Sequence, residues 1–252
     1  LTSIFSNKSS CSYEGLKQEN RMGTRLAVIV PVVNTGLADK MFASIERNTV
    51  HPQRILIIDN SNRDETYNPH IQWRHLELTV MKYPQNIGVN ESWNVGIKHV
   101  GKCDLLSILN DDIILNERFF ERLVAPFQLI DCAVICPQTE NTIENFERAK
   151  LNAPLAFDVA PMKRREGWAF TYRKDILDKL PRIPVEQFRT FCGDDWFWYH
   201  TAMLKYRWYR DFNNVIYHKV GASLDILPDL RETLRAEKEA FALELQKIRG
   251  VK

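Results

Sequence analysis

The chain has 252 residues, of which 44% are hydrophobic and 26% charged, so it is long enough to bury a core and has an ordinary globular composition. Its formal net charge of +2 is too small to argue for nucleic-acid binding and is compatible with an anionic ligand. Five cysteines without a Cys-x-x-Cys pair argue against a disulfide framework or a structural zinc site, and they favour a reducing compartment.

Residues 1–24 are polar and have no apolar centre, so we expect a flexible N-terminal leader rather than a secretory signal. No apolar run approaches the roughly 20 residues that a membrane-spanning helix needs. The longest run, Leu26–Val33, is interrupted by Pro31. We therefore expect a cytoplasmic protein without an integral membrane segment, and a bacterial, viral or phage source is compatible with this expectation.

Strand-like and helix-like patterns alternate along the first half of the chain. Strands are predicted at 26–33, 54–62, 76–84, 104–115 and 132–137, the third with an alternating pattern, and helices at 36–48, 86–100 and 116–127. This alternation predicts an α/β fold with a mainly parallel sheet flanked by helices on both faces. The second half is less regular, with a strand running into a helix at 165–180, an aromatic segment at 188–210, a short strand at 214–223 and a charged helix at 228–248.

The fourth predicted strand is interrupted by Asn110, Asp111 and Asp112. Ligands of parallel α/β sheets bind beyond the carboxyl ends of the strands, where this interruption and Asp59 are expected to meet. Adjacent carboxylates repel each other and are costly to bury, and a divalent cation removes both problems. Aspartates with oxygen-rich neighbours suit Mg²⁺ or Mn²⁺. The alternative is an ordinary turn that caps the following helix.

Five segments in a fixed order resemble the family 2-like glycosyltransferases of GT-A fold, over about Leu26–Ser223. They are AVIVPVVN, ILIIDNSN, NIGVNESWNVGI, LNDDI, and GDDWFW followed by VIYHKVGAS. The resemblance implies a single GT-A (nucleotide-diphospho-sugar transferase) domain at 25–225, with a nucleotide-binding half (25–115), an acceptor half (116–225) and a C-terminal helix at 226–252. It also implies metal-dependent transfer with inversion from a nucleoside-diphosphate sugar, with a UDP-sugar as the default donor.

The resemblance also implies roles for individual residues. The nucleotide-sugar would be held by Pro31, Val33, Asn34, Asp59, Asn86, Gly88, Asn94, Asn110 and Asp111. Asp112 would bind Mn²⁺ or Mg²⁺, assisted by Asn110, Asp111 or His218. Asn110 replaces the first carboxylate of the usual Asp-x-Asp motif, which keeps an oxygen acceptor and loses a charge.

An acceptor hydroxyl is a poor nucleophile, so a carboxylate must take its proton. Asp194 and Asp195 stand where relatives commonly carry Glu-Asp, which makes Asp195 the predicted base and Asp194 its orienting partner, with the reverse assignment open. Trp168 and Trp196 are candidates for stacking on an acceptor sugar, or else for filling the core. The acceptor can be a glycan, a glycoprotein or a modified nucleic acid, and the sequence leaves the oligomeric state open.

Two other functions stay open at this point. A nucleotidyltransferase would usually carry a Gly-rich phosphate loop with a basic residue near the first strand, whereas PVVNTGLADK has one glycine and a distant Lys40. A catalytically weak or inactive module that binds a nucleotide or glycan is favoured by Asn110. The Asp194–Asp195 pair argues against such a module, because a domain that removes no proton has no need of it.

Overall fold

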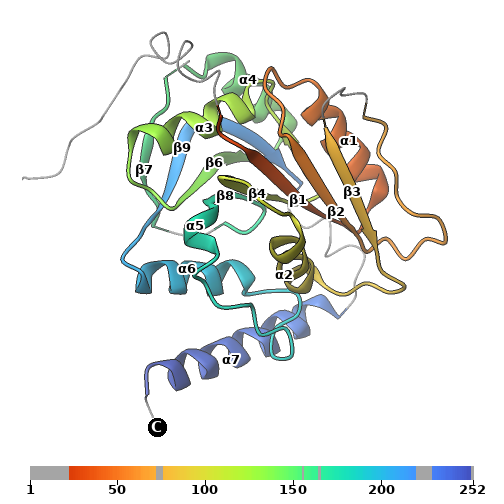
Figure 1. Cartoon of the computed structure of the whole chain (residues 1–252), viewed down its shortest axis with the longest axis vertical. Coiled ribbons are helices and arrows are strands. Elements are labelled where there is room, and N and C mark those ends of the chain that lie inside the picture. The colour runs from red at the N-terminus through yellow and green to blue at the C-terminus, as the bar shows by residue number, and fades with distance from the viewer. Residues whose placement is uncertain (1–22, 72–75, 155, 164–165, 220–228, 251–252) are drawn as a thin grey trace, which may run out of the picture.

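A nine-stranded mixed sheet lies at the centre of the computed structural model, which describes residues 23–71, 76–154, 156–163, 166–219 and 229–250 (Figure 1). The strands are β1 (Leu26–Val32), β2 (Arg54–Asp59), β3 (Glu77–Lys82), β4 (Leu105–Leu109), β5 (Ile113–Leu115), β6 (Val134–Glu140), β7 (Val159–Pro161), β8 (Ala169–Arg173) and β9 (Trp208–His218). The helices are α1 (Thr35–Glu46), α2 (Val89–His99), α3 (Phe119–Leu129), α4 (Ile143–Asn152), α5 (Lys174–Leu177), α6 (Gly193–Met203) and α7 (Leu230–Ile248).

The first half of the sheet is parallel, and β1, β2 and β4 are buried within it, whereas β3 is partly exposed. Strands β3, β2, β1 and β4 are neighbours in that order, and all three pairs run parallel. Alternate residues of β1 point to opposite faces, so Val28 and Val30 pack with Phe42 of α1, whereas Ile29 packs with Trp93 of α2. The two layers of helices are therefore α1 with α3 on one face and α2 with α5 and α6 on the other, as the α/β prediction required.

The second half of the sheet mixes directions. Its order continues β4-β8-β6-β9-β5, and β8 is antiparallel to both of its neighbours, β4 and β6. The predicted strand 104–115 is in fact two strands, which corrects that expectation. Residues 110–112 form a turn that takes the chain from β4, inside the sheet, to β5, which pairs antiparallel with β9 at the other end of the strand order.

Two elements, α4 and β7, were not predicted, because α4 buries only Phe146 and β7 is three residues long. The expected C-terminal helix is present as α7, which lies beside α6 in Figure 1. The predicted leader at 1–24 falls almost entirely outside the described residues, and the proposed division into halves at 115 stays a prediction. Within the described ranges, no helix is long and apolar enough to cross a bilayer.

The close approach of α2 to β1 depends on Gly96. A Cβ atom at this position would lie 2.6–2.9 Å from three side-chain atoms of Ile29. We therefore expect Gly96→Ala to lower the free energy of unfolding by about 1–3 kcal/mol through overpacking, measured by urea denaturation. The matched control is Gly36→Ala in α1, where the new Cβ would meet only Asn34 Oδ1 at 3.5 Å. It should be neutral or stabilise by up to about 1 kcal/mol, and equal effects of the two substitutions would contradict this packing.

Candidate active site

The turn at 110–112 is attached to the end of β1 by Asp111. One carboxylate oxygen of Asp111 accepts hydrogen bonds from the backbone N–H groups of Val33 and Asn34, both at 2.8 Å. Burial raises the pKa of Asp111 to about 6, although these two hydrogen bonds act in the opposite direction. Asn34 in turn caps α1, because its Oδ1 accepts the N–H of Leu37. Asp111 and Asn34 thus fix the loop that follows β1, and their contact with a nucleotide stays a prediction.

Asp112, the last residue before β5, lies beside His218, the last residue of β9. The antiparallel pairing of β5 and β9 places His218 opposite Ile113, and Asp112 Oδ2 lies 3.3 Å from His218 Nε2. The two side chains are only 8% and 10% exposed. The fold thus brings these two residues together from distant parts of the chain, and their shared role in binding an ion stays a prediction.

Three buried polar atoms of this pair and of the turn before it have no hydrogen-bond partner among the described residues: Asp112 Oδ1, His218 Nδ1 and Asn110 Oδ1. Buried polar groups are normally paired, and a bound ion is one way in which these atoms would find partners. A carboxylate, an imidazole and an amide oxygen fit Mn²⁺ or Mg²⁺. No group of three or more His, Cys, Asp or Glu side chains able to hold a metal occurs in the described part of the chain. The protein would therefore supply only some of the ligands of the ion, and substrate phosphates and water would supply the others.

Trp168 packs against His218, and its stacking on an acceptor sugar stays a prediction. The two ring centroids are 4.7 Å apart and the ring planes are inclined by 13°, a stacked arrangement. The indole N–H of Trp168 donates to Thr139 Oγ1 at 2.8 Å, and its carbonyl accepts the N–H of Asn110 at 2.9 Å. One indole face is thus covered by the imidazole, and Trp168 fixes the orientation of that ring.

The two predicted catalytic acids occupy the first turn of α6, where the helix dipole favours carboxylate charge. Cys192, just before the helix, has the left-handed conformation (φ 64°), which turns the chain into α6. A Cβ atom at Gly167 would lie 2.9 Å from the carboxylate carbon of Asp194. Asp194 therefore lies against the residue next to Trp168, so Asp194 and the Asp112–His218 pair border the same short segment.

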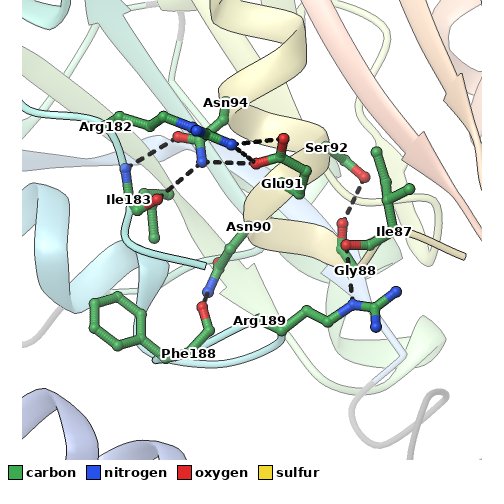
Figure 2. Close-up of polar contacts among 10 residues, drawn as sticks. All are labelled: Ile87, Gly88, Asn90, Glu91, Ser92, Asn94, Arg182, Ile183, Phe188 and Arg189. Carbon is green, nitrogen blue, oxygen red and sulfur yellow. Dashed lines mark hydrogen bonds and ion pairs between the residues drawn. The ribbon is translucent and has the colours of Figure 1, made fainter. Parts of the chain in front are cut away.

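Asn86, Gly88 and Asn94 are the predicted donor-binding residues that lie within α2 and just before it. In the Asn86–Gly88 segment, Asn86 Oδ1 accepts the N–H of Gly88 at 2.7 Å, and Gly88 has a φ of 86°. The Arg189 side chain donates to the carbonyl of Asn86. It also donates to the carbonyl of Ile87, as Figure 2 shows. Asn94, by contrast, binds both the N–H and the C=O of Ile183, each at 3.0 Å (Figure 2). The chain itself thus uses both amide atoms of Asn94, and a contact of this residue with the nucleotide stays a prediction.

Asp59, at the end of β2, is buried and makes hydrogen bonds within the chain, and its contact with a nucleotide stays a prediction. Asp59 is 1% exposed, and its two oxygens accept hydrogen bonds from Ser61 and from the N–H of Tyr67. Burial alone would raise the pKa of Asp59, but these hydrogen bonds lower it below its ordinary value.

Trp196 is 5% exposed and its indole N–H donates to the carbonyl of Pro181. The expected stacking of Trp196 on an acceptor sugar is therefore wrong, because the ring lies in the core. Pro31 is likewise buried within β1.

Comparison with known proteins identifies the family of this fold and site. A family model described as glycosyl transferase family 2 matches residues 27–193, and the chain therefore belongs to this family. The match ends at the first residue of α6, so His218 and α7 lie beyond it. No curated protein matches the sequence.

Solved structures agree with the fold at low sequence identity. The structure of GalNAc-T7 with UDP, GalNAc and Mn²⁺ superposes with a TM-score of 0.58 at 11% identity, covering 77% of this chain and 43% of that one. Residues 1–349 of S. aureus TarS, alone and in complex with UDP, give TM-scores of 0.53 and 0.55 at 15% identity, covering 86% of this chain and 65% of theirs. The chain thus spans less than two thirds of these structures, and the likeness establishes a GT-A glycosyltransferase fold.

Proposed function

We propose that the protein transfers a sugar from a nucleoside-diphosphate sugar, with a UDP-sugar as the donor, to an acceptor hydroxyl, with inversion and with dependence on Mn²⁺ or Mg²⁺. The observation that carries this proposal is the Asp112–His218 pair with its unpartnered buried oxygen and nitrogen atoms, bordering the segment that also contacts Asp194. Membership of glycosyl transferase family 2 supports the reaction class. The UDP and Mn²⁺ in the similar structures support the choice of donor and ion.

Asp112 and His218 would hold the ion, with Asn110 Oδ1 as a third donor. When bound, such an ion supplies the positive charge that stabilises a departing diphosphate. Asp111 and Asn34 keep the β1–α1 loop beside it, because the Asp111 carboxylate holds the N–H groups of Val33 and Asn34. The Asn86–Gly88 segment, fixed by Arg189, would bind the donor from the neighbouring strand ends.

Asp195 would remove the proton of the acceptor hydroxyl as that oxygen attacks the anomeric carbon, and Asp194 would orient it. A single displacement of this kind inverts the anomeric configuration and forms no covalent sugar–enzyme intermediate. We propose a carbohydrate hydroxyl, on a glycan or a glycoprotein, as the acceptor. A modified nucleic acid is the alternative that an acceptor screen would reveal.

The proposal is tested by incubating the full chain with a panel of nucleotide-sugars and carbohydrate acceptors, with Mn²⁺, with Mg²⁺ or with EDTA. We expect one donor to be consumed only in the presence of the ion, and product analysis by NMR to show an inverted anomeric centre. Retention of configuration would contradict the single displacement. Nucleotide-dependent thermal stabilisation without any ion-dependent sugar release would favour a binding module, the alternative that Asn110 raises.

Trp168 gives a graded prediction on ion binding. Because its ring stacks on His218, Trp168→Ala should leave the imidazole free to rotate and raise the half-saturating Mn²⁺ concentration by about 2- to 12-fold, as expected for an aromatic pair worth about 0.5–1.5 kcal/mol. Trp168→Phe keeps a ring at this position and should show a smaller effect. The measurement is a Mn²⁺ titration followed by thermal unfolding at fixed UDP. Wild-type Mn²⁺ affinity in Trp168→Ala would exclude this role.

A further inference from the structure

Glu237 of α7 lies outside the family match and is buried, with 8% exposure, although it is a carboxylate on a helix rich in charge. Its oxygens accept hydrogen bonds from three consecutive backbone N–H groups. Oε1 accepts from Arg189 at 2.9 Å and from Thr190 at 3.1 Å, and Oε2 accepts from Thr190 at 3.0 Å and from Phe191 at 2.6 Å. A carboxylate is buried at such a site only when it is bonded in this way.

An apolar contact holds the same face of α7 against the same loop. Phe241, four residues after Glu237 and therefore on the same side of the helix, packs edge-to-face on Phe188 at a centroid distance of 5.7 Å. At the end of α7, Arg249 lies over the ring of Tyr199 of α6. Helix α7 therefore docks on the loop at 188–191 and on α6 through polar and apolar contacts together.

The other polar groups of this loop are held by α2 and the segment before it. The side-chain amide of Asn90 donates to the carbonyls of Phe188 and Phe191, at 2.8 and 2.7 Å. The Arg189 side chain donates to the carbonyl of Ile87, as Figure 2 shows. Glu237 thus holds the N–H side of the loop, and Asn90 holds its C=O side.

The loop at 188–191 leads directly into α6, the helix that carries Asp194 and Asp195. Cys192 follows it with a left-handed backbone, and Gly193 begins α6 so close to α2 that a Cβ atom would lie 2.1 Å from Asn90 Oδ1. Any displacement of the loop at 188–191 therefore moves the first turn of α6, where Asp194 and Asp195 lie. We propose that Glu237 is a positioning residue, which fixes the loop at 188–191 and through it the acidic pair relative to the donor segment. This inference rests on the proposed function.

The test compares Glu237→Gln with Glu239→Gln, a matched change at an exposed position of the same helix. Glutamine keeps the size of the side chain, but it loses the charge and turns an NH₂ group toward backbone donors. We expect amide hydrogen exchange at 189–191 to become at least tenfold faster in Glu237→Gln. The kcat for transfer should fall at least tenfold, and by a larger factor than the donor KM rises, because Arg189 also contacts the donor segment. Glu239→Gln should behave as wild type in every measurement.

The two readouts separate this inference from the proposed function. Unchanged exchange at 189–191, or raised exchange with wild-type kcat, would overturn the positioning role. Raised exchange in a chain whose wild-type form transfers no sugar would reject the proposed function and leave the contact between Glu237 and the loop standing. If Glu237→Gln fails to unfold cooperatively, Glu237→Asp retains the charge with a shorter reach. That variant should show intermediate exchange and intermediate kcat, and wild-type values for both would overturn the inference.

Discussion

Asp195→Asn is expected to lower kcat for sugar transfer by about 10²- to 10⁴-fold, the range over which a general base contributes. Asparagine has the shape of aspartate but cannot accept the acceptor's proton at neutral pH. The Asp112–His218 pair and the Asn86–Gly88 segment are untouched, so UDP binding measured by calorimetry should stay within twofold of wild type. The loss should therefore appear in kcat and hardly at all in the donor KM.

Asp194→Asn is the matched control for this prediction, because it makes the same chemical change one residue away in the same helical turn. We expect a smaller loss, since Asp194 lies against Gly167 and acts by orienting its neighbour. A larger loss in Asp194→Asn than in Asp195→Asn would reverse the assignment of the base. Transfer at the wild-type rate by Asp195→Asn would exclude Asp195 from proton removal.

Asp112→Ala is expected to abolish the part of the UDP-induced stabilisation that depends on Mn²⁺. A ligand at 100 times its dissociation constant stabilises a protein by about 2.7 kcal/mol, so loss of the ion contribution should be visible as a shift in melting temperature. The physical reason is that Asp112 supplies the carboxylate of the buried pair with His218. The measurement is thermal unfolding with UDP, with and without Mn²⁺ or EDTA.

Asp111→Asn provides the comparison at the neighbouring position. Its carboxylate binds the N–H groups of Val33 and Asn34, so the substitution should lower overall stability while the difference between Mn²⁺ and EDTA persists. Asp104→Asn, at an exposed site on the far end of β4, controls for loss of a surface charge. An Mn²⁺-dependent shift of wild-type size in Asp112→Ala would contradict the assignment of Asp112.

Local sequence patterns were sufficient for the parallel half of the sheet. Buried parallel strands are nearly continuous apolar runs, as β1 and β2 are, whereas β3 shows an alternating pattern. All three strands lie within the predicted ranges. The sequence pattern could place an interruption at 110–112, but it could not show that β5 pairs with β9 and not with the neighbours of β4. That choice depends on pairing with β9, about a hundred residues later in the chain. Helix α4 was missed because it presents a single buried apolar residue, Phe146.

In the candidate site, too, the sequence could suggest individual residues but not the contacts between residues that are far apart in the chain. The sequence could propose Asp112 and His218, but only the fold shows that Trp168 covers one face of the imidazole. Trp168 and Trp196 looked alike as candidate sugar platforms, and burial separates them. Asn90 and Glu237 gave no signal at all, since their partners are backbone groups about a hundred and about fifty residues away. No spacing rule can anticipate such contacts.

A structure of the full chain crystallised with UDP and Mn²⁺ would test the central claim most directly, since the anomalous signal locates the ion. We predict an anomalous peak in direct coordination with Asp112 Oδ1 or Oδ2, a nitrogen of His218 and the diphosphate oxygens of UDP. A diphosphate bound elsewhere, or an ion with no contact to Asp112 and His218, would contradict the account.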